Sequence, residues 1–457
     1  MTEMTIAQMG RRSFLSGAAT AAAVVAGGVG FDALGAAPAG ASPVEGGLAR
    51  HRRPGPTADR ALVPVADRAT GLELLKLPPG FAYTTFGWRG DVMDDGIATP
   101  GVHDGMAAFR QGHSVRLVRN HEQGSLSGAY ASGMTYDPMA DGGTTTLEFD
   151  LRSGEFTRSY ASLSGTLRNC AGGPTPWGTW LSCEETTLVN GEVRHGYVFE
   201  VPTDGTASGE PLRSLGRFSH EAVAVDPSTG IVYLTEDATP SGLYRFVPDV
   251  PGDLAAGGRL QMAAIGGAST VTYADTAPHD YGEIGWVDIA QPDPGPAEPS
   301  TVTQGIAAGG AQFERLEGIW YHDRTIYFVS TSGGPERGQV FAYSPRRNRL
   351  QLVFHSPSPE VLDSPDNICV SPRSGLVLCE DGSGREFMHG LTQDGEIFPL
   401  AENNVVLNGE RGLFGDFSGS EWCGATFEPR QGEWLFVNIQ NPGFTVAITG
   451  PFRELGL

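Results

Sequence analysis

Six segments of the sequence repeat one layout, and this repetition constrains the fold more than any other feature. In each segment a run of apolar residues ends in polar side chains, and a loop then leads to a second apolar run. The first runs lie at residues 114–122, 177–185, 230–237, 324–331, 375–381 and 433–438. Short runs bounded by Gly, Pro, Asp and Asn are typical of β-strands. The repetition predicts an all-β fold, a six-bladed β-propeller with loop insertions, with five or seven blades as alternatives.

The spacing of the copies also predicts the domain organisation. The copies lie about 50 residues apart, so residues 76–457 are expected to form a single propeller domain. The gap between the third and fourth copies is wider, and residues 249–312 fill it as an insertion rich in Ala, Gly and Pro. The insertion is expected to be either a lid over the channel mouth or a surface loop. Residues 42–75 are expected to be an N-terminal arm or linker.

The composition excludes several classes of protein. The chain has 53 acidic and 31 basic residues, a net charge of −22, which argues against a nucleic-acid or anionic-lipid partner. Its 64 Gly and 32 Pro argue against a helical bundle and supply the turns that a propeller needs. A monomer is expected.

Residues 1–41 have the order of an export signal. Arg11 and Arg12 form a twin-arginine pattern, an apolar stretch follows at residues 17–31, and Ala39-Gly40-Ala41 matches a cleavage site. A membrane anchor is the alternative, but the stretch is short and rich in Gly. We therefore expect export by the twin-arginine (Tat) machinery to the periplasm or the extracellular space, with no stable membrane anchor on the mature chain.

Acidic residues recur at two places in the repeats. One set ends an apolar strand: Glu184, Glu185, Glu236, Asp237, Glu380 and Asp381. A second set begins the next repeat and includes His121, Glu122, Cys170, His220, Glu221, Arg315, Glu317, Asp366 and Asn367. Equivalent positions of all blades surround one channel, where this many carboxylates repel one another unless cations neutralise them. Oxygen ligands suit Ca²⁺ or Mg²⁺, and a thiolate or imidazole suits a transition metal, so the pattern predicts a multinuclear metal site.

Each of these residues also has a simpler interpretation. A single acid at the end of a strand is usually a solvated turn residue. Cys170 could be an inert buried thiol, as could most of the five cysteines, and His121 and His220 could be packing residues. Arg315 could be part of a surface ion pair, but an arginine among acids at a channel mouth also suits an anion such as phosphate.

Several motifs, in order along nearly the whole mature chain, resemble the PhoX-type alkaline phosphatases. They lie at residues 77–83, 119–122, 168–185, 216–222, 314–318, 366–367 and 438–443, and the stretch around Cys170 is the most specific. The resemblance implies a six-bladed propeller that carries a di-iron centre with calcium ions and hydrolyses a small phosphate ester. It also implies that Cys170 binds iron, that Glu317 is shared by metals, and that Arg315 holds the phosphate. Glu221, Glu184 and Glu185 match further metal ligands.

We extend these expectations to the other polar strand ends. Glu236, Asp237, Glu380, Asp381, Asp366, Asn367 and Glu122 are candidate metal ligands, and Arg168 and His121 are candidate substrate-binding residues beside Arg315. Two other functions stay open. One is a calcium-dependent lactonase or esterase, in which Asp366, Asn367 and Glu317 hold one Ca²⁺. The other is a non-enzymatic propeller that binds a partner.

Overall fold

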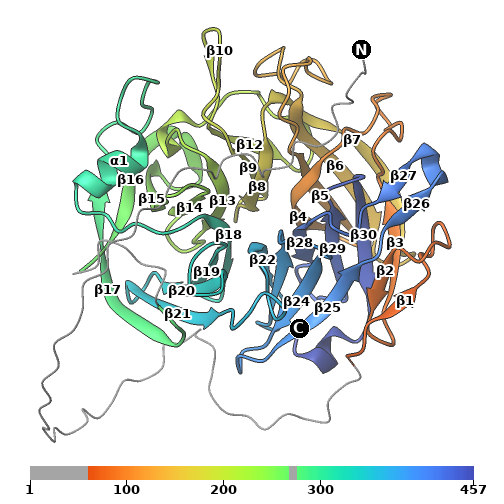
Figure 1. The fold of residues 1–457 in the computed structure, drawn as a ribbon. Helices are drawn as coiled ribbons and strands as arrows, with labels where there is room; N and C mark the ends of the chain where they lie inside the picture. Colours follow the sequence, from red (N-terminus) through yellow and green to blue (C-terminus); the bar gives the residue numbers. More distant parts are fainter. Residues whose placement is uncertain (1–59, 267–274) are drawn as a thin grey trace, which may run out of the picture. The chain divides into compact units, whose positions relative to one another are not determined.

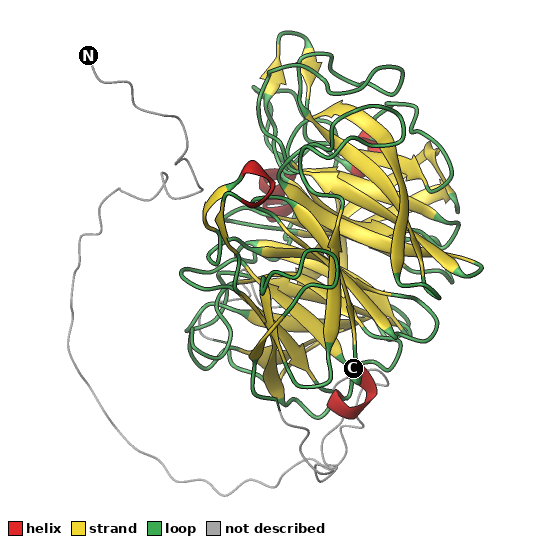
Figure 2. Cartoon of the chain, turned by 90° about the vertical axis from the view of Figure 1, so that its right-hand side faces the viewer, coloured by secondary structure: helices red, strands yellow, loops and turns green. Residues whose placement is uncertain are grey.

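The computed structural model describes residues 60–266 and 275–457, and these residues form an all-β structure. The predicted export signal and most of the predicted arm lie outside the described residues. Figure 2 shows that strands make up most of the fold and that helices are short. The α-helix of the described residues is α1 (Thr301–Ala307), and short 3₁₀ turns occur at Arg213–Leu215, Glu410–Gly412 and Phe452–Leu455. None of these helices is long and apolar enough to cross a membrane.

The strands form antiparallel sheets built mostly from strands that are consecutive in the chain, although β1, β2 and β3 join sheets of later strands. One four-stranded sheet contains β4 (His103–Gln111), β5 (Ser114–His121), β6 (Gly142–Asp150) and β7 (Glu155–Thr166). A three-stranded sheet contains β8 (Asn169–Pro174), β9 (Thr179–Glu184) and β12 (Val198–Pro202). A second four-stranded sheet contains β28 (Trp422–Phe427), β29 (Trp434–Ile439), β30 (Phe444–Thr449) and β3 (Ala82–Phe86).

Two sheets are larger. The six-stranded sheet contains β22 (Pro365–Val370), β23 (Leu376–Glu380), β24 (Phe387–Leu391), β25 (Ile397–Asn403), β2 (Leu75–Leu77) and β1 (Val63–Val65). The nine-stranded sheet begins with β13 (His220–Val225), β14 (Val232–Glu236), β15 (Leu243–Val250), β16 (Asp253–Ile265) and β17 (His279–Asp288). It continues through β21 (Arg349–His355), β20 (Gln339–Ser344), β19 (Thr325–Ser330) and β18 (Leu316–His322). Two small hairpins, β10 (Val189–Asn190) with β11 (Val193–Arg194) and β26 (Val406–Asn408) with β27 (Phe414–Asp416), lie outside these sheets.

The prediction of an all-β propeller-like fold is confirmed, but the prediction of six blades is wrong. Only four sheets of the described residues have four or more strands. The sheet of β8, β9 and β12 has three, and β17 pairs with both β16 and β21, which joins two expected blades into one sheet. This joining strand comes from residues 249–312, expected as an insertion, which also contain β16 and α1. Sequence repeats reveal strand pairs, but they do not reveal which sheets a further strand connects.

Six strands line the centre of the fold and are called the ring strands below. β4 contacts β8, β8 contacts β13, β13 contacts β18, β18 contacts β22, β22 contacts β28, and β28 contacts β4 (Figure 1). Every residue of β13, β22 and β28 is buried, because neighbouring sheets cover both faces. The ring places the first residues of all six strands around one axis.

Candidate metal centre

Each ring strand carries a β-bulge near its beginning. The pairing register shifts after His103 in β4, Asn169 in β8, His220 in β13, Leu316 in β18, Pro365 in β22 and Cys423 in β28. Five of these bulges contain an acid or a thiol, namely Asp104, Cys170, Glu221, Glu317 and Asp366, and the sixth begins at Cys423. A bulge re-aims the side chain of its extra residue. The sequence therefore brings six possible metal-binding side chains to equivalent places around the axis.

Four of these side chains follow a residue in the left-handed backbone region. Val102, Arg168, Arg315 and Ser364 have φ values of 47°, 51°, 40° and 51°, and each lies two residues before a bulge residue. This conformation costs about 1 kcal/mol for a residue with a side chain. The repeated turn gives Arg168 and Arg315 equivalent places beside the centre.

The bulge residues and the acids that follow the neighbouring strands form one continuous cluster, called the metal centre below. Five groups of three side chains have possible ligand atoms within 4.8 Å of one another. The groups are Cys170–Glu185–Glu221, Glu185–Asp237–Glu317, Glu221–Glu317–Asp366, Asp366–Asp381–Glu421 and Asp104–Glu421–Cys423. Since neighbouring groups share members, the ten side chains form a single centre of eight carboxylates and two thiols.

The buried acids of the metal centre lack sufficient compensating positive charge, which indicates that the centre binds cations. Glu221 and Glu317 are buried, and the Oε2 atom of each has no hydrogen-bond partner. Burial, together with the neighbouring carboxylates, raises the pKa of both groups well above the usual value. Burial and Glu221 also raise the pKa of the Cys170 thiol. Unpartnered buried carboxylate oxygens beside a thiol fit divalent or trivalent cations, which would satisfy the oxygens and reverse these shifts.

Two arginines border the metal centre. Arg315 donates from Nε and Nη2 to the two carboxylate oxygens of Asp237 at 2.7 and 3.1 Å, and from Nη2 to Glu317. Glu317 is the main reason that the pKa of Arg315 is raised. Arg168 donates to Glu185 at 2.6 Å and to Glu122 at 3.1 Å. The side chains of Arg315 and Arg168 are 28% and 36% exposed, so both can reach a ligand that enters from solvent.

In each predicted pair of adjacent acids, only the second belongs to the metal centre. Glu185, Asp237 and Asp381 do, whereas Glu184, Glu236 and Glu380 are absent from the groups found among the described residues. Successive side chains of a strand point to opposite faces, so two adjacent acids cannot share one site.

The first acid of each pair instead accepts hydrogen bonds from neighbouring segments of the chain. Glu184 accepts hydrogen bonds from the backbone N–H of Leu167 and Gly196, at 2.9 and 2.8 Å. Glu236 accepts from the Tyr244 hydroxyl at 2.6 Å. Glu380 accepts from the N–H of Phe387 at 3.0 Å and lies 2.9 Å from His389 Nε2. These acids stabilise the connection to the third strand of each sheet.

Two further predicted residues, His121 and Glu122, are not members of the metal centre. His121 is buried, with its ring nitrogens 3.0 Å from Gly101 O and 2.9 Å from Thr145 Oγ1, and burial lowers its pKa. It is a packing residue in this arrangement. Glu122 is held by Arg168 and Gln440 and contacts the metal centre through Arg168. Asn367 follows Asp366 in β22 and is buried.

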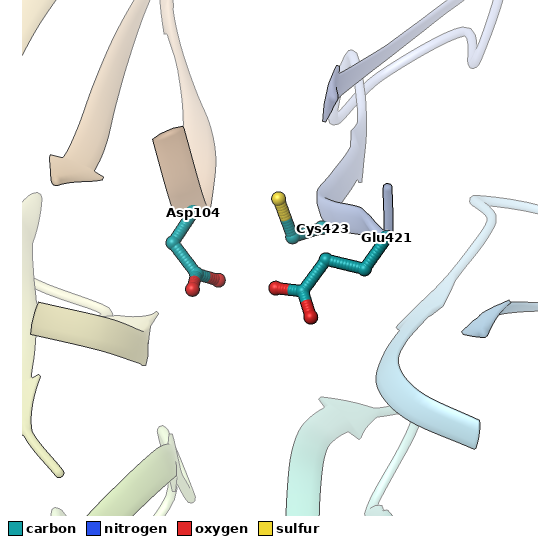
Figure 3. Close-up of side chains that lie close together, drawn as sticks. All are labelled: Asp104, Glu421 and Cys423. Carbon is teal, nitrogen blue, oxygen red and sulfur yellow. The ribbon is translucent and has the colours of Figure 1, made fainter. Parts of the chain in front are cut away.

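Three members of the metal centre are not predicted by the sequence pattern: Asp104, Glu421 and Cys423. In Figure 3 the Asp104 carboxylate, at the start of β4, lies opposite Glu421, which directly precedes β28, and Cys423, the second residue of β28. Cys423, like all five cysteines, is free and buried, and it donates to His103 O at 3.0 Å.

A signal for Asp104 and Cys423, though not for Glu421, was present in the sequence. Five of the six bulge positions are followed by Gly or Ala, as in Asp104-Gly105, Glu317-Gly318 and Cys423-Gly424. A Cβ atom on Gly105 would lie 2.5 Å from Ala171 Cα, and one on Gly318 would lie 2.7 Å from Ile368 N. The ring strands therefore approach too closely for larger residues. An acid or thiol followed by a small residue is thus common to five of the ring positions, although pairs such as Asp141-Gly142 and Asp204-Gly205 also occur elsewhere in the chain.

Comparisons with known proteins agree with this geometry. The sequence profile described as "Alkaline phosphatase PhoX" matches residues 60–160 and 151–443. The structure resembles that of Pseudomonas fluorescens PhoX in complex with vanadate, described as a transition-state analogue. The TM-score is 0.62 and the identity 18%, over 87% of this chain and 98% of that one. No curated protein sequence matches the chain.

Two other solved structures resemble the chain less. A gluconolactonase of Xanthomonas campestris gives a TM-score of 0.41 at 12% identity, over 88% of this chain and all of that one. A Bacteroides thetaiotaomicron protein of unknown function gives 0.41 at 9% identity, over 82% and 78%.

The propeller-like fold and the family match define a metal-dependent hydrolase of phosphate esters. The chain belongs to the PhoX alkaline phosphatase family. The resemblance drawn from the sequence motifs is thereby confirmed.

Proposed function

We propose that the chain hydrolyses a small phosphate ester at the metal centre described above. The observation that carries this proposal is the pairing of unpartnered buried carboxylate oxygens, on Glu221 and Glu317, with Arg315 at the edge of the same cluster. Carboxylates that bind cations, next to an arginine that binds oxyanions, suit a phosphoryl group.

The donor set indicates which metals the centre would hold. The carboxylates Glu185, Glu221, Asp237, Glu317, Asp366, Asp381, Glu421 and Asp104 suit calcium, and the thiols of Cys170 and Cys423 suit iron. We therefore propose iron, in a di-iron centre near Cys170, together with calcium. When bound, these cations supply positive charge that stabilises the charge developing on the phosphoryl oxygens.

The arginines would bind and orient the substrate. Arg315 uses three of its five N–H donors in the bonds to Asp237 and Glu317, which leaves the Nη1 donors for a phosphoryl oxygen. Its partners also hold the guanidinium in one orientation, so that little entropy is lost on binding. Arg168, at the equivalent turn of a neighbouring ring strand, is a second candidate for substrate binding.

We also propose that residues 1–41 direct export by the Tat machinery, and that the protein acts as a monomer in the periplasm or outside the cell. The twin-arginine pathway carries folded proteins, which suits an enzyme that receives its metals before export. The net charge of −22 favours a small substrate over nucleic acid.

The proposal is tested by purifying the exported protein, measuring its metals by elemental analysis and assaying hydrolysis of p-nitrophenyl phosphate. We expect iron and calcium in the protein and hydrolysis that Arg315→Ala suppresses. Arg116→Ala is the matched control, because Arg116 also pairs with an acid, Glu148 at 3.0 Å, but lies outside the metal centre. Absence of both metals together with absence of hydrolysis would refute the proposal.

A further inference from the structure

The backbone that carries Cys170 is held by a side chain of the neighbouring sheet. In β8, Cys170 and Ala171 stand in the bulge between Asn169 and Gly172, so their carbonyls are turned away from regular pairing with β9. Asn120, the residue before last of β5, donates from Nδ2 to Cys170 O at 3.1 Å and to Ala171 O at 2.7 Å. The amide thus binds both carbonyls of the bulge.

The orientation of Asn120 is itself fixed. Its Oδ1 atom accepts hydrogen bonds from Trp180 Nε1 and Ser182 Oγ, both at 2.9 Å, and both residues belong to β9. The indole N–H can only donate, so it identifies which amide atom is the oxygen. Asn120 is fully buried, and its two N–H groups and its oxygen are all used. No other residue of similar size offers two donors and an acceptor in this geometry.

A related contact, to one bulge carbonyl, occurs at a second place in the ring. Asn438 in β29 donates from Nδ2 to Asp104 O at 2.6 Å, and its Oδ1 accepts from Thr445 Oγ1 at 2.6 Å. In both cases an asparagine on the second strand of one sheet holds the bulge of the next ring strand. The repetition argues that these contacts belong to the architecture of the metal centre.

We infer that Asn120 is a positioning residue that fixes the Cys170 sulfur for metal binding. Cys170 Sγ lies with Glu185 and Glu221 in one group of the metal centre and 3.2 Å from His220 O. A short side chain has only one torsion between its backbone and its sulfur, so the position of Sγ follows the position of the bulge. This inference rests on the proposed function, since it assumes that Cys170 binds a metal.

The test compares Asn120→Asp and Asn120→Ala with the unaltered, full-length exported protein. Asp keeps the acceptor for Trp180 but cannot donate to the two carbonyls, and Ala removes the contact without adding charge. The first readout is the visible thiolate-to-iron absorption of the protein as purified. The second is the thiolate-to-metal ultraviolet absorption during titration with Cd²⁺ alone, after metal removal. We expect both variants to bind Cd²⁺ about 10- to 100-fold more weakly, which is usual when a partner of a metal ligand is lost.

Two controls separate this role from a general loss of stability. Asn348→Asp removes an amide that donates to Ile284 O and accepts from the Tyr343 hydroxyl at 2.8 Å, away from the metal centre. It should lower the melting temperature without changing either absorption. Cys170→Ser should abolish the thiolate absorption attributed to this residue.

The outcomes are distinguishable. If the Asn120 variants keep the absorption and Cd²⁺ affinity of the unaltered protein, the positioning role is wrong and the proposed function stands. If the unaltered protein shows no absorption that depends on Cys170, then Cys170 binds no metal, and both the inference and that part of the proposed function fail.

Discussion

Glu221 and Glu317 face the same central space from the neighbouring ring strands β13 and β18, and each has one buried carboxylate oxygen without a hydrogen-bond partner. Burial of such oxygens lowers the stability of the folded state unless a cation binds them. Because of these two oxygens, the stability of the fold depends on whether cations occupy the metal centre.

Metal removal should therefore destabilise the protein. Chelation leaves the acids of the metal centre either repelling one another or buried in the protonated form. Binding of a metal to the folded state alone stabilises that state by about 3 kcal/mol at a hundredfold excess over the dissociation constant. Differential scanning calorimetry should show a lower melting temperature after chelation and recovery when Ca²⁺ and iron are returned. An unchanged melting temperature would mean that the centre does not bind metals.

Replacement of Arg315 should lower catalysis more than replacement of Arg168. Arg315 contacts two members of the metal centre, Glu317 and Asp237, whereas Arg168 contacts one member, Glu185, and pairs also with Glu122, which is not a member. Arg315→Ala should reduce kcat/KM for p-nitrophenyl phosphate about 100-fold, a common cost for loss of one charge-stabilising donor. Arg315→Lys should recover only part of this, because an ammonium lacks the planar pair of donors. Equal losses in Arg315→Ala and the control Arg116→Ala would contradict the assignment.

Replacement of Glu185 should lower metal binding, whereas replacement of the adjacent Glu184 should lower stability. Glu185→Gln removes a ligand shared by two groups of the centre and should lower the metal content measured by elemental analysis. Glu184→Gln disturbs hydrogen bonds to buried N–H groups and should lower the free energy of unfolding by about 1.5–3 kcal/mol while the metal content is kept. Urea titration of both variants checks the second value. The reverse pattern would show that the two side chains face the other way.

Gly318→Ala should disturb the ring itself. Its Cβ would lie 2.7 Å from Ile368 N and 2.8 Å from Asp366 O, and backbone atoms cannot move aside as a flexible side chain can. Overpacking of this kind costs about 1–3 kcal/mol. Gly205→Ala is the control, since no atom lies within 4 Å of the added methyl group. If both variants melt at the same temperature, the ring strands have room that the structure does not show.

The stability should also depend on pH through Glu386, which is not among the ten side chains of the metal centre but accepts a hydrogen bond from the N–H of Gly382, next to Asp381, at 3.0 Å. Burial raises its pKa to about 8. Between the ordinary value and pH 8 the folded protein keeps a proton that the unfolded chain has lost, so stability falls as pH rises through this window, by about 1.4 kcal/mol per unit. Glu386→Gln imitates the protonated form. Urea titrations from pH 5 to pH 8 should therefore show the variant gaining stability relative to the unaltered protein as pH rises, and parallel curves would refute the shift.

The sequence predicted the strands and part of the metal centre for physical reasons that can be traced. Acids at the ends of apolar strands are easy to recognise in a sequence, and Asp237 and Asp381 were predicted as metal ligands for this reason. The sequence alone does not show whether Glu184 or Glu185 is the metal ligand, because this depends on which face of β9 is turned to the axis. Asp104 was missed because β4 precedes the first recognised repeat. The merging of two sheets through β17 depends on pairing between residues 279–283 and 349–352, which no local pattern encodes.

The pairing of β3 with β30 sets the order in which the protein can be made. The last sheet is complete only when a strand from near the start of the described chain meets one that ends at Thr449, and the donors of the metal centre extend from Asp104 to Cys423. A growing chain on the ribosome cannot close the ring before β30 has been synthesised, and it cannot assemble all the ligands before Cys423 has been synthesised. Loading of the complete centre consequently follows synthesis of the whole segment from Asp104 to Cys423.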